Sequence, residues 1–153
     1  MPDYTSRLVR VRNLVLDDHA MLRAELERLE LCAIAIDAGG GVNALAGERL
    51  RRAACAMSEH FERHLAYEDS RLVPLIAKLD DWGAGHARAM RKDHHEQREA
   101  LVLIKRASAI ADALTLAKEV HEFVTCLRAD MNGEERDLRL LLEDMTEVGA
   151  CTG

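Results

Sequence analysis

A helical stripe of apolar residues in the first half of the chain is interrupted by a histidine and a glutamate. The stripe advances in steps of three and four residues, which is the spacing of one helix face. Its members are Leu50, Ala54, Met57, Phe61, His64, Glu68, Leu72, Leu75 and Leu79. Burial of an imidazole and a carboxylate among leucines costs several kcal/mol unless the two are paired or bind a metal. His64 and Glu68 are therefore predicted to have partners on other helices.

The composition and the segment pattern indicate an all-α protein. Of the 153 residues, 48% are hydrophobic but only 3% are aromatic, which is typical of helix bundles. Amphipathic helices are predicted at about 6–37, 43–79, 86–107 and 112–146, with a glycine run from Gly39 ending the first and Pro74 kinking the second. Because the connections are short, neighbouring helices should be antiparallel. This predicts a single up-down-up-down four-helix bundle over residues 1–153.

Each of the other three predicted helices also carries polar residues in its apolar stripe. They are His19 in the first helix, His94 in the third, and Asp130 and Glu134 in the fourth. One such histidine would be explained by a neutral imidazole bonded to a backbone carbonyl, and one such glutamate by a buried ion pair. However, no lysine or arginine occupies a facing stripe position, and all four helices share the feature. The pattern therefore favours metal ligands.

The second half of the chain repeats the first at these positions. The aligned pairs, at two offsets, are His19 with His94, His64 with Asp130, and Glu68 with Glu134. An internal duplication of a helix pair would place two ligand sets around a pseudo-twofold axis. The repeat therefore predicts a dinuclear metal centre in the bundle core.

Three further residues lie beside the predicted ligands. They are His60 and its repeat partner Cys126, each one turn before a predicted ligand, and Tyr67, next to one. Each is either a spare ligand, a hydrogen-bonding neighbour of a ligand or a packing residue, and the sequence does not choose between these roles.

Charge and motif content exclude several classes of function. A net charge of −6 provides no basic surface to displace counterions, so nucleic acid is not an expected partner. No apolar run approaches the roughly 20 residues of a membrane span, and no signal-peptide core is present, so a cytoplasmic location is expected. The four cysteines lack Cys-x-x-Cys spacing and are expected to be reduced. Metalloprotease, phosphate-loop and nucleophile-elbow motifs are absent.

In the residues named above, the chain resembles the hemerythrin-like family, also called the HHE cation-binding family, over nearly its whole length. The family pattern is a histidine on helix one, His-x-x-x-Glu on helix two, one or two histidines on helix three and a second such pair on helix four. His19, His64 with Glu68, and His94 match the first three parts. The segment from Glu68 to Pro74 also resembles the glutamate-to-proline segment of the family.

The chain departs from the family pattern at two positions. Asp130 stands where the family has a histidine on helix four, although Glu134 keeps its place. Met90 stands one turn before His94, where some members have a second histidine, which adds Met90 to the candidate spare ligands. The resemblance implies a hemerythrin-like fold that holds iron, with two ions expected and manganese or zinc as alternatives. The implied ligands are His19, His64, Glu68, His94, Asp130 and Glu134.

The function that the resemblance implies is that of a non-heme dinuclear iron protein that reacts with or senses oxygen, peroxide or nitric oxide. Asp130 adds negative charge and is a smaller ligand than histidine, so oxidation or peroxide turnover is expected rather than a long-lived oxygen adduct. The sequence does not decide between an enzymatic and a sensory role, and it does not give the oligomeric state. The alternative is a degenerate bundle, metal-free or zinc-filled, that acts as a protein-interaction or regulatory module.

Overall fold

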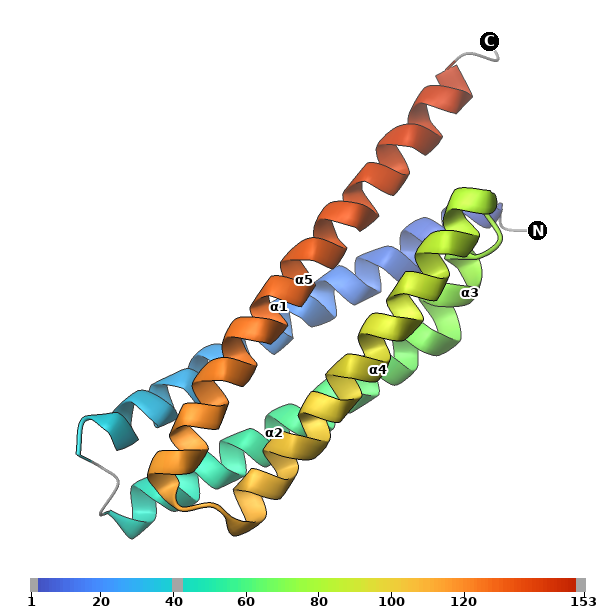
Figure 1. Cartoon of the computed structure of the whole chain (residues 1–153). Coiled ribbons are helices and arrows are strands. Elements are labelled where there is room, and N and C mark those ends of the chain that lie inside the picture. The colour runs from blue at the N-terminus through green and yellow to red at the C-terminus, as the bar shows by residue number, and fades with distance from the viewer. Residues whose placement is uncertain (1–2, 40–42, 151–153) are drawn as a thin grey trace.

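Four long helices, the second of them interrupted by a π turn, form the molecule. The computed structural model describes residues 3–39 and 43–150, with side chains described as far as Leu141 in the last helix. The elements are α1 (Tyr4–Asp37), α2 (Ala44–Tyr67), the π-helical turn η2 (Glu68–Leu72), α3 (Val73–Ile76), α4 (Asp81–Ile110) and α5 (Ala113–Ala150). Successive long helices run in opposite directions (Figure 1). No strand occurs among the described residues, so the prediction of an all-α four-helix bundle is confirmed.

Local capping accounts for the end of α1 and the start of α2. Gly39 follows α1 with a φ of 106°, a left-handed conformation that glycine adopts without steric cost. Gly40 and Gly41, the rest of the glycine run, lie outside the described residues. The side chain of Asn43 then accepts the backbone N–H of Leu45 at 2.9 Å, which satisfies one of the free donors at the start of α2.

The helix that contains Pro74 changes its pitch before the proline. Pro74 has no N–H to donate and its ring crowds the carbonyl of the preceding turn. The chain widens into η2, where the backbone N–H of Val73 reaches the carbonyl of Glu68, the spacing of a π-helical turn. The expected kink therefore takes the form of a π turn that begins at Glu68, and the helical segment ends at Ile76 rather than at residue 79.

The third long helix, α4, begins earlier than the sequence predicted. Residues 80–85 were expected to form a loop, but α4 starts at Asp81. The side chain of Asp80 accepts the backbone N–H of Gly83 at 2.7 Å, which is an N-cap that starts a helix despite two glycines in its first turns. The predicted helix start at residue 86 was therefore wrong by about one turn.

We expect Gly83→Ala to lower the free energy of unfolding by about 1–3 kcal/mol, in the range of other overpacking changes. A Cβ at Gly83 would collide with the backbone carbonyl oxygen of Ile76 and lie 3.0 Å from the Cβ of Leu79. Gly85→Ala is the matched control, because its Cβ would meet only the guanidinium of Arg88 at 3.8 Å. That variant should gain up to about 1 kcal/mol from helix propensity. Urea titration of both variants provides the measurement, and equal stability of the two would contradict the close approach.

Two apolar clusters fill the bundle and a polar layer separates them. The larger cluster, around Leu26, Phe61 and Leu127, occupies the end with the α1–α2 and α4–α5 connections. The smaller cluster, around Val15 and Leu138, packs η2 and α3 against α1, α4 and α5. On each of the four long helices, the stripe positions that carry histidine or glutamate lie between the two clusters. The fold therefore gathers these residues in one layer. Among the described residues, no helix is both long and apolar enough to cross a membrane.

Candidate metal centre

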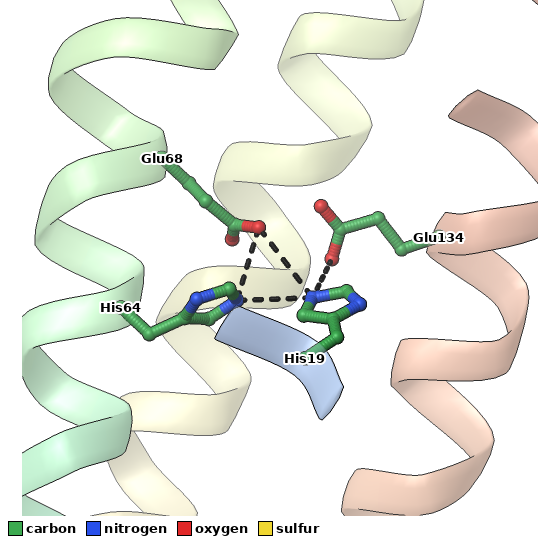
Figure 2. Close-up of side chains that lie close together, drawn as sticks. All are labelled: His19, His64, Glu68 and Glu134. Atoms are coloured by element: carbon green, nitrogen blue, oxygen red, sulfur yellow. Dashed lines mark hydrogen bonds and ion pairs between the residues drawn. The ribbon is translucent and has the colours of Figure 1, made fainter. Parts of the chain in front are cut away.

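Four side chains, one each from α1, α2, η2 and α5, converge in the polar layer (Figure 2). His19, His64, Glu68 and Glu134 each place one potential ligand atom within 4.8 Å of the others. The Nε2 atoms of His19 and His64 are 3.1 Å apart. Oε1 of Glu68 lies 3.0 Å from Nε2 of His64 and 3.8 Å from Nε2 of His19. Oε2 of Glu134 lies 3.8 Å from Nε2 of His19. These atoms enclose one position.

The third predicted histidine, His94 on α4, faces the other oxygen of Glu68. Its Nε2 lies 3.1 Å from Oε2 of Glu68, whereas Nε2 of His64 faces Oε1. The carboxylate is fully buried. Glu68 is therefore shared between the imidazoles of His19 and His64 on one side and that of His94 on the other.

Each of the three imidazoles has a carboxylate on its outward nitrogen. Nδ1 of His19 lies 3.0 Å from Glu135, Nδ1 of His64 lies 2.8 Å from Asp18, and Nδ1 of His94 lies 2.6 Å from Asp69. A carboxylate accepts hydrogen bonds, so each Nδ1 carries the proton and each Nε2 presents its lone pair to the centre. Carboxylates that fix a histidine in this way orient it as a metal ligand and increase its basicity.

Two arginines hold these outer carboxylates in place. Arg23 on α1 donates to Glu135 on α5, and Arg98 on α4 lies 2.7 Å from Asp69. The positive charges offset part of the negative charge outside the centre, while the ion pairs of Glu68 and Glu134 among the described side chains are all with histidines.

The π turn explains how two successive residues serve one histidine. Consecutive residues of a regular α-helix project about 100° apart. At the start of η2, however, Glu68 faces Nε2 of His94 and Asp69 faces Nδ1 of the same ring. The widened turn therefore both accommodates Pro74 and supplies His94 with its two carboxylate partners.

The arrangement fits a bound cation. The Nε2 atoms of His19 and His64 lie 3.1 Å apart, so either a proton on one ring or a bound cation has to lie between them. Both oxygens of Glu68 and Oε1 of Glu134 are buried without a hydrogen-bond partner. Buried polar atoms normally have hydrogen-bond partners, and ion binding is one standard reason for an exception. Imidazole nitrogens with carboxylate oxygens suit iron or manganese, and zinc as well.

The titratable groups of the centre shift in different directions. Burial raises the pKa of the Glu68 carboxyl, but the three imidazoles outweigh it, so its pKa lies well below the usual range. Burial opposes protonation of His64, yet its carboxylate partners hold its pKa above the ordinary value. Burial, followed by the charge of Glu68, raises the pKa of Glu134 well above the usual range. Two carboxylates this close repel each other when both are ionised, and a cation would remove that repulsion.

The predicted position of Asp130 in the buried stripe is wrong. Its side chain is exposed, and Met131, which is 2% exposed, continues the buried face after Leu127. A step of four residues rather than three brings α5 back to its buried side before Glu134. The structure does not bring Asp130 into the four-residue group. Instead, Asp130 accepts a hydrogen bond from Gln97 at 3.2 Å.

The four candidate flanking residues have different surroundings. His60 is buried and bonds Asp18 at 2.8 Å, so it shares that carboxylate with His64. Met90 is buried among apolar residues of the smaller cluster, and Tyr67 packs against the same cluster. Cys126 is exposed. Of these four, His60 alone is placed to support a ligand through a hydrogen-bonded neighbour.

The sequence analysis missed the outer carboxylates Asp18, Asp69 and Glu135. Each directly precedes or follows a residue of the centre in the sequence. Adjacency to a candidate ligand is the signal in the sequence that marks them.

The fold and the site define the class of this protein as a four-helix bundle with a candidate His/Glu metal site. Comparison with known families agrees: the model of the hemerythrin HHE cation binding domain matches residues 10–141. The chain therefore belongs to the hemerythrin HHE cation-binding family, as its resemblance predicted. No curated protein and no solved structure matches it at a significant level.

Proposed function

We propose that this protein binds iron at two unequal positions and, when loaded, reacts with or responds to oxygen, peroxide or nitric oxide. The main support for the proposal is that the two carboxylate oxygens of Glu68 face different histidines. Oε1 faces His64 and Oε2 faces His94. A carboxylate that offers its two oxygens to different imidazoles is arranged to bridge two ions. Membership of a cation-binding family supports the assignment.

The two positions would differ in strength. His19, His64, Glu68 and Glu134 would hold the first ion with two imidazoles and two carboxylates. The second would have His94 and the far oxygen of Glu68, because Met90 is packed in an apolar cluster and Asp130 is exposed. Fewer protein ligands imply weaker binding and more exchangeable positions at the second ion.

Bound iron would supply the electron-transfer and oxygen chemistry that these side chains lack. The residues around it set the conditions. Glu68 and Glu134 bring negative charge into the layer, which stabilises a higher oxidation state and lowers the reduction potential. The carboxylates on the three outward nitrogens hold the rings in one orientation, and the apolar clusters cover the layer on two sides. These features favour oxidation of the loaded protein over reversible oxygen carriage. The sequence analysis expected the same outcome from Asp130, but here Glu68 and Glu134 provide the negative charge.

Anaerobic titration with ferrous iron tests the proposal. We expect binding in two steps, one ion per chain bound tightly and a second at least about tenfold more weakly, because the second position lacks one imidazole and one carboxylate of the first. Equilibrium dialysis with elemental analysis measures both steps. Two identical steps would contradict the inequality of the positions. Retention of less than about 0.3 ion per chain would overturn the metal function and favour the metal-free interaction module.

The second arm of the experiment adds oxygen or hydrogen peroxide to the reduced, loaded protein. The near-ultraviolet spectrum should change once and persistently, and the oxidant should be consumed at a rate above that of the metal-free protein. A spectrum that returns to its starting form when oxygen is removed would identify an oxygen carrier instead.

A further inference from the structure

Two adjoining hollows lie between α4 and α5, beside the metal centre. Their volumes are about 390 Å³ and about 280 Å³. Asp93, Gln97 and Asp130 line both hollows, and the smaller one also reaches His94 and Glu134. The hollows thus form one cleft, hereafter the α4–α5 cleft, which reaches one residue of each candidate metal position, Glu134 of the first and His94 of the second.

The α4–α5 cleft carries a strong negative charge. Its carboxylates are Asp93, Glu96, Glu119, Glu122, Asp130, Glu134 and Asp137. Among its lining residues, Arg136 is the one lysine or arginine that opposes them. A cleft of one sign with low-dielectric walls concentrates ions of the opposite sign and excludes ions of the same sign. The cleft therefore favours cations over anions.

Gln97 provides a second, independent sign of a ligand. Its side chain is 9% exposed and sits on the wall that the two hollows share. Its Nε2 donates to Asp130 at 3.2 Å, whereas its Oε1 is buried without a hydrogen-bond partner. An amide oxygen held beside a carboxylate by such a bond matches the oxygen ligands that hard divalent cations accept.

We propose that Gln97, Asp130 and Asp93 form an entry site, which captures a hydrated divalent cation in the α4–α5 cleft and passes it to Glu134. This inference rests on the proposed metal function. Asp130 and Glu134 are four residues apart on α5, one helical turn along the same side. The smaller hollow, at 280 Å³, exceeds the roughly 180 Å³ that six waters of about 30 Å³ each require. The unpartnered oxygens of Gln97 and Glu134 would replace those waters in turn.

The first test measures the rate at which metal-free protein takes up ferrous iron under anaerobic conditions. Uptake is stopped with a chelator at timed intervals, and retained iron is counted. Asp93→Asn/Asp130→Asn should load about three- to tenfold more slowly than the unmodified chain at low ionic strength, and the difference should shrink as salt screens the cleft. Its final iron content should stay at the unmodified level, because neither residue belongs to the four-residue group.

Glu27→Gln/Glu59→Gln is the matched control. It removes the same number of charges from exposed positions on α1 and α2, outside the lining of the α4–α5 cleft. Its uptake rate should stay within twofold of the unmodified rate. Equal rates for the two double variants would overturn the entry site.

Substitutions at Gln97 test the amide oxygen separately. Gln97→Leu removes the oxygen and should slow uptake, whereas Gln97→Glu keeps an oxygen there, adds charge and should restore or exceed the original rate. Both variants lose the donor to Asp130, so a common slowing would assign the effect to that hydrogen bond and contradict the proposal.

The possible outcomes distinguish failure of the entry site from failure of the proposed metal function. A fall in the final iron content of Asp93→Asn/Asp130→Asn, in proportion to the fall in its uptake rate, would make one of the two residues a ligand and overturn the entry role. Unchanged rates with full iron content would overturn the entry site and leave the metal function intact. An unmodified chain that retains no iron would overturn both.

Discussion

Replacing Glu68 with glutamine should leave the protein, purified from iron-supplemented cells, with less than about a tenth of the unmodified iron content. Glu68 places one oxygen 3.0 Å from His64 and the other 3.1 Å from His94, so both metal positions depend on it. Removing a group that merely orients a ligand costs about 10–100-fold in metal affinity. Loss of the shared ligand should cost at least that much at each position. Elemental analysis after gentle purification provides the measurement.

Glu62→Gln is the control for this substitution. Glu62 lies on α2 and pairs with Arg98 at 3.1 Å, and its side chain is 44% exposed. This variant should keep its iron, and circular dichroism should show both variants folded, because glutamine preserves the volume of Glu68 and removes a buried charge. Full iron content in Glu68→Gln would place the metal somewhere other than the polar layer.

The fold and most of the centre follow from the apolar stripes. Leucine-rich faces at steps of three and four residues determine which side of each helix is buried. Short connections then determine the antiparallel order. A histidine or glutamate in such a face has to lie in the core, and His19, His64 and Glu68 do so at 0–3% exposure. Their convergence was predictable because isolated buried polar groups are too costly to retain.

The register of α5 could not be predicted with the same certainty. After Leu127 a helix with 3.6 residues per turn permits a step of three, to Asp130, or of four, to Met131. The repeat favoured Asp130 because it aligns with His64. Packing against α1 and α2 buries Met131 in the larger cluster instead, and the resulting exposure of Asp130 places it in the α4–α5 cleft. The choice depends on neighbours that one helix does not reveal.

The histidine partners of the outer carboxylates could not be predicted from the sequence for a similar reason. Asp18 precedes His19 in the sequence but bonds His64 and His60 on α2. Asp69 meets His94 because the chain widens into a π turn, which the sequence indicates only through Pro74 in the next turn. Adjacent helical residues point in different directions, so adjacency to a ligand does not show which ring a carboxylate serves.

Chelation of the bound metal should lower the melting temperature by about 8–16 °C. At a free iron concentration of about 1,000 Kd, binding stabilises the folded state by about 4 kcal/mol, and about 2–4 °C accompany each kcal/mol in a chain of this length. The polar layer separates the two apolar clusters. Without a cation this layer combines two imidazole nitrogens 3.1 Å apart with buried carboxylate oxygens that lack partners. Removal of the metal should therefore weaken the layer that joins the two halves of the core.

Scanning calorimetry with and without a chelator measures this shift, and Glu68→Gln serves as the internal control. That variant should melt at one temperature in both conditions, because it holds little metal to lose. A shift in Glu68→Gln equal to that of the unmodified chain would show that the chelator acts elsewhere. An unmodified chain that melts at the same temperature with and without chelator would mean that the polar layer is stable on its own. Protons and water would then have to satisfy the unpartnered oxygens of Glu68 and Glu134. The metal-free interaction module would become the better-supported function of this bundle.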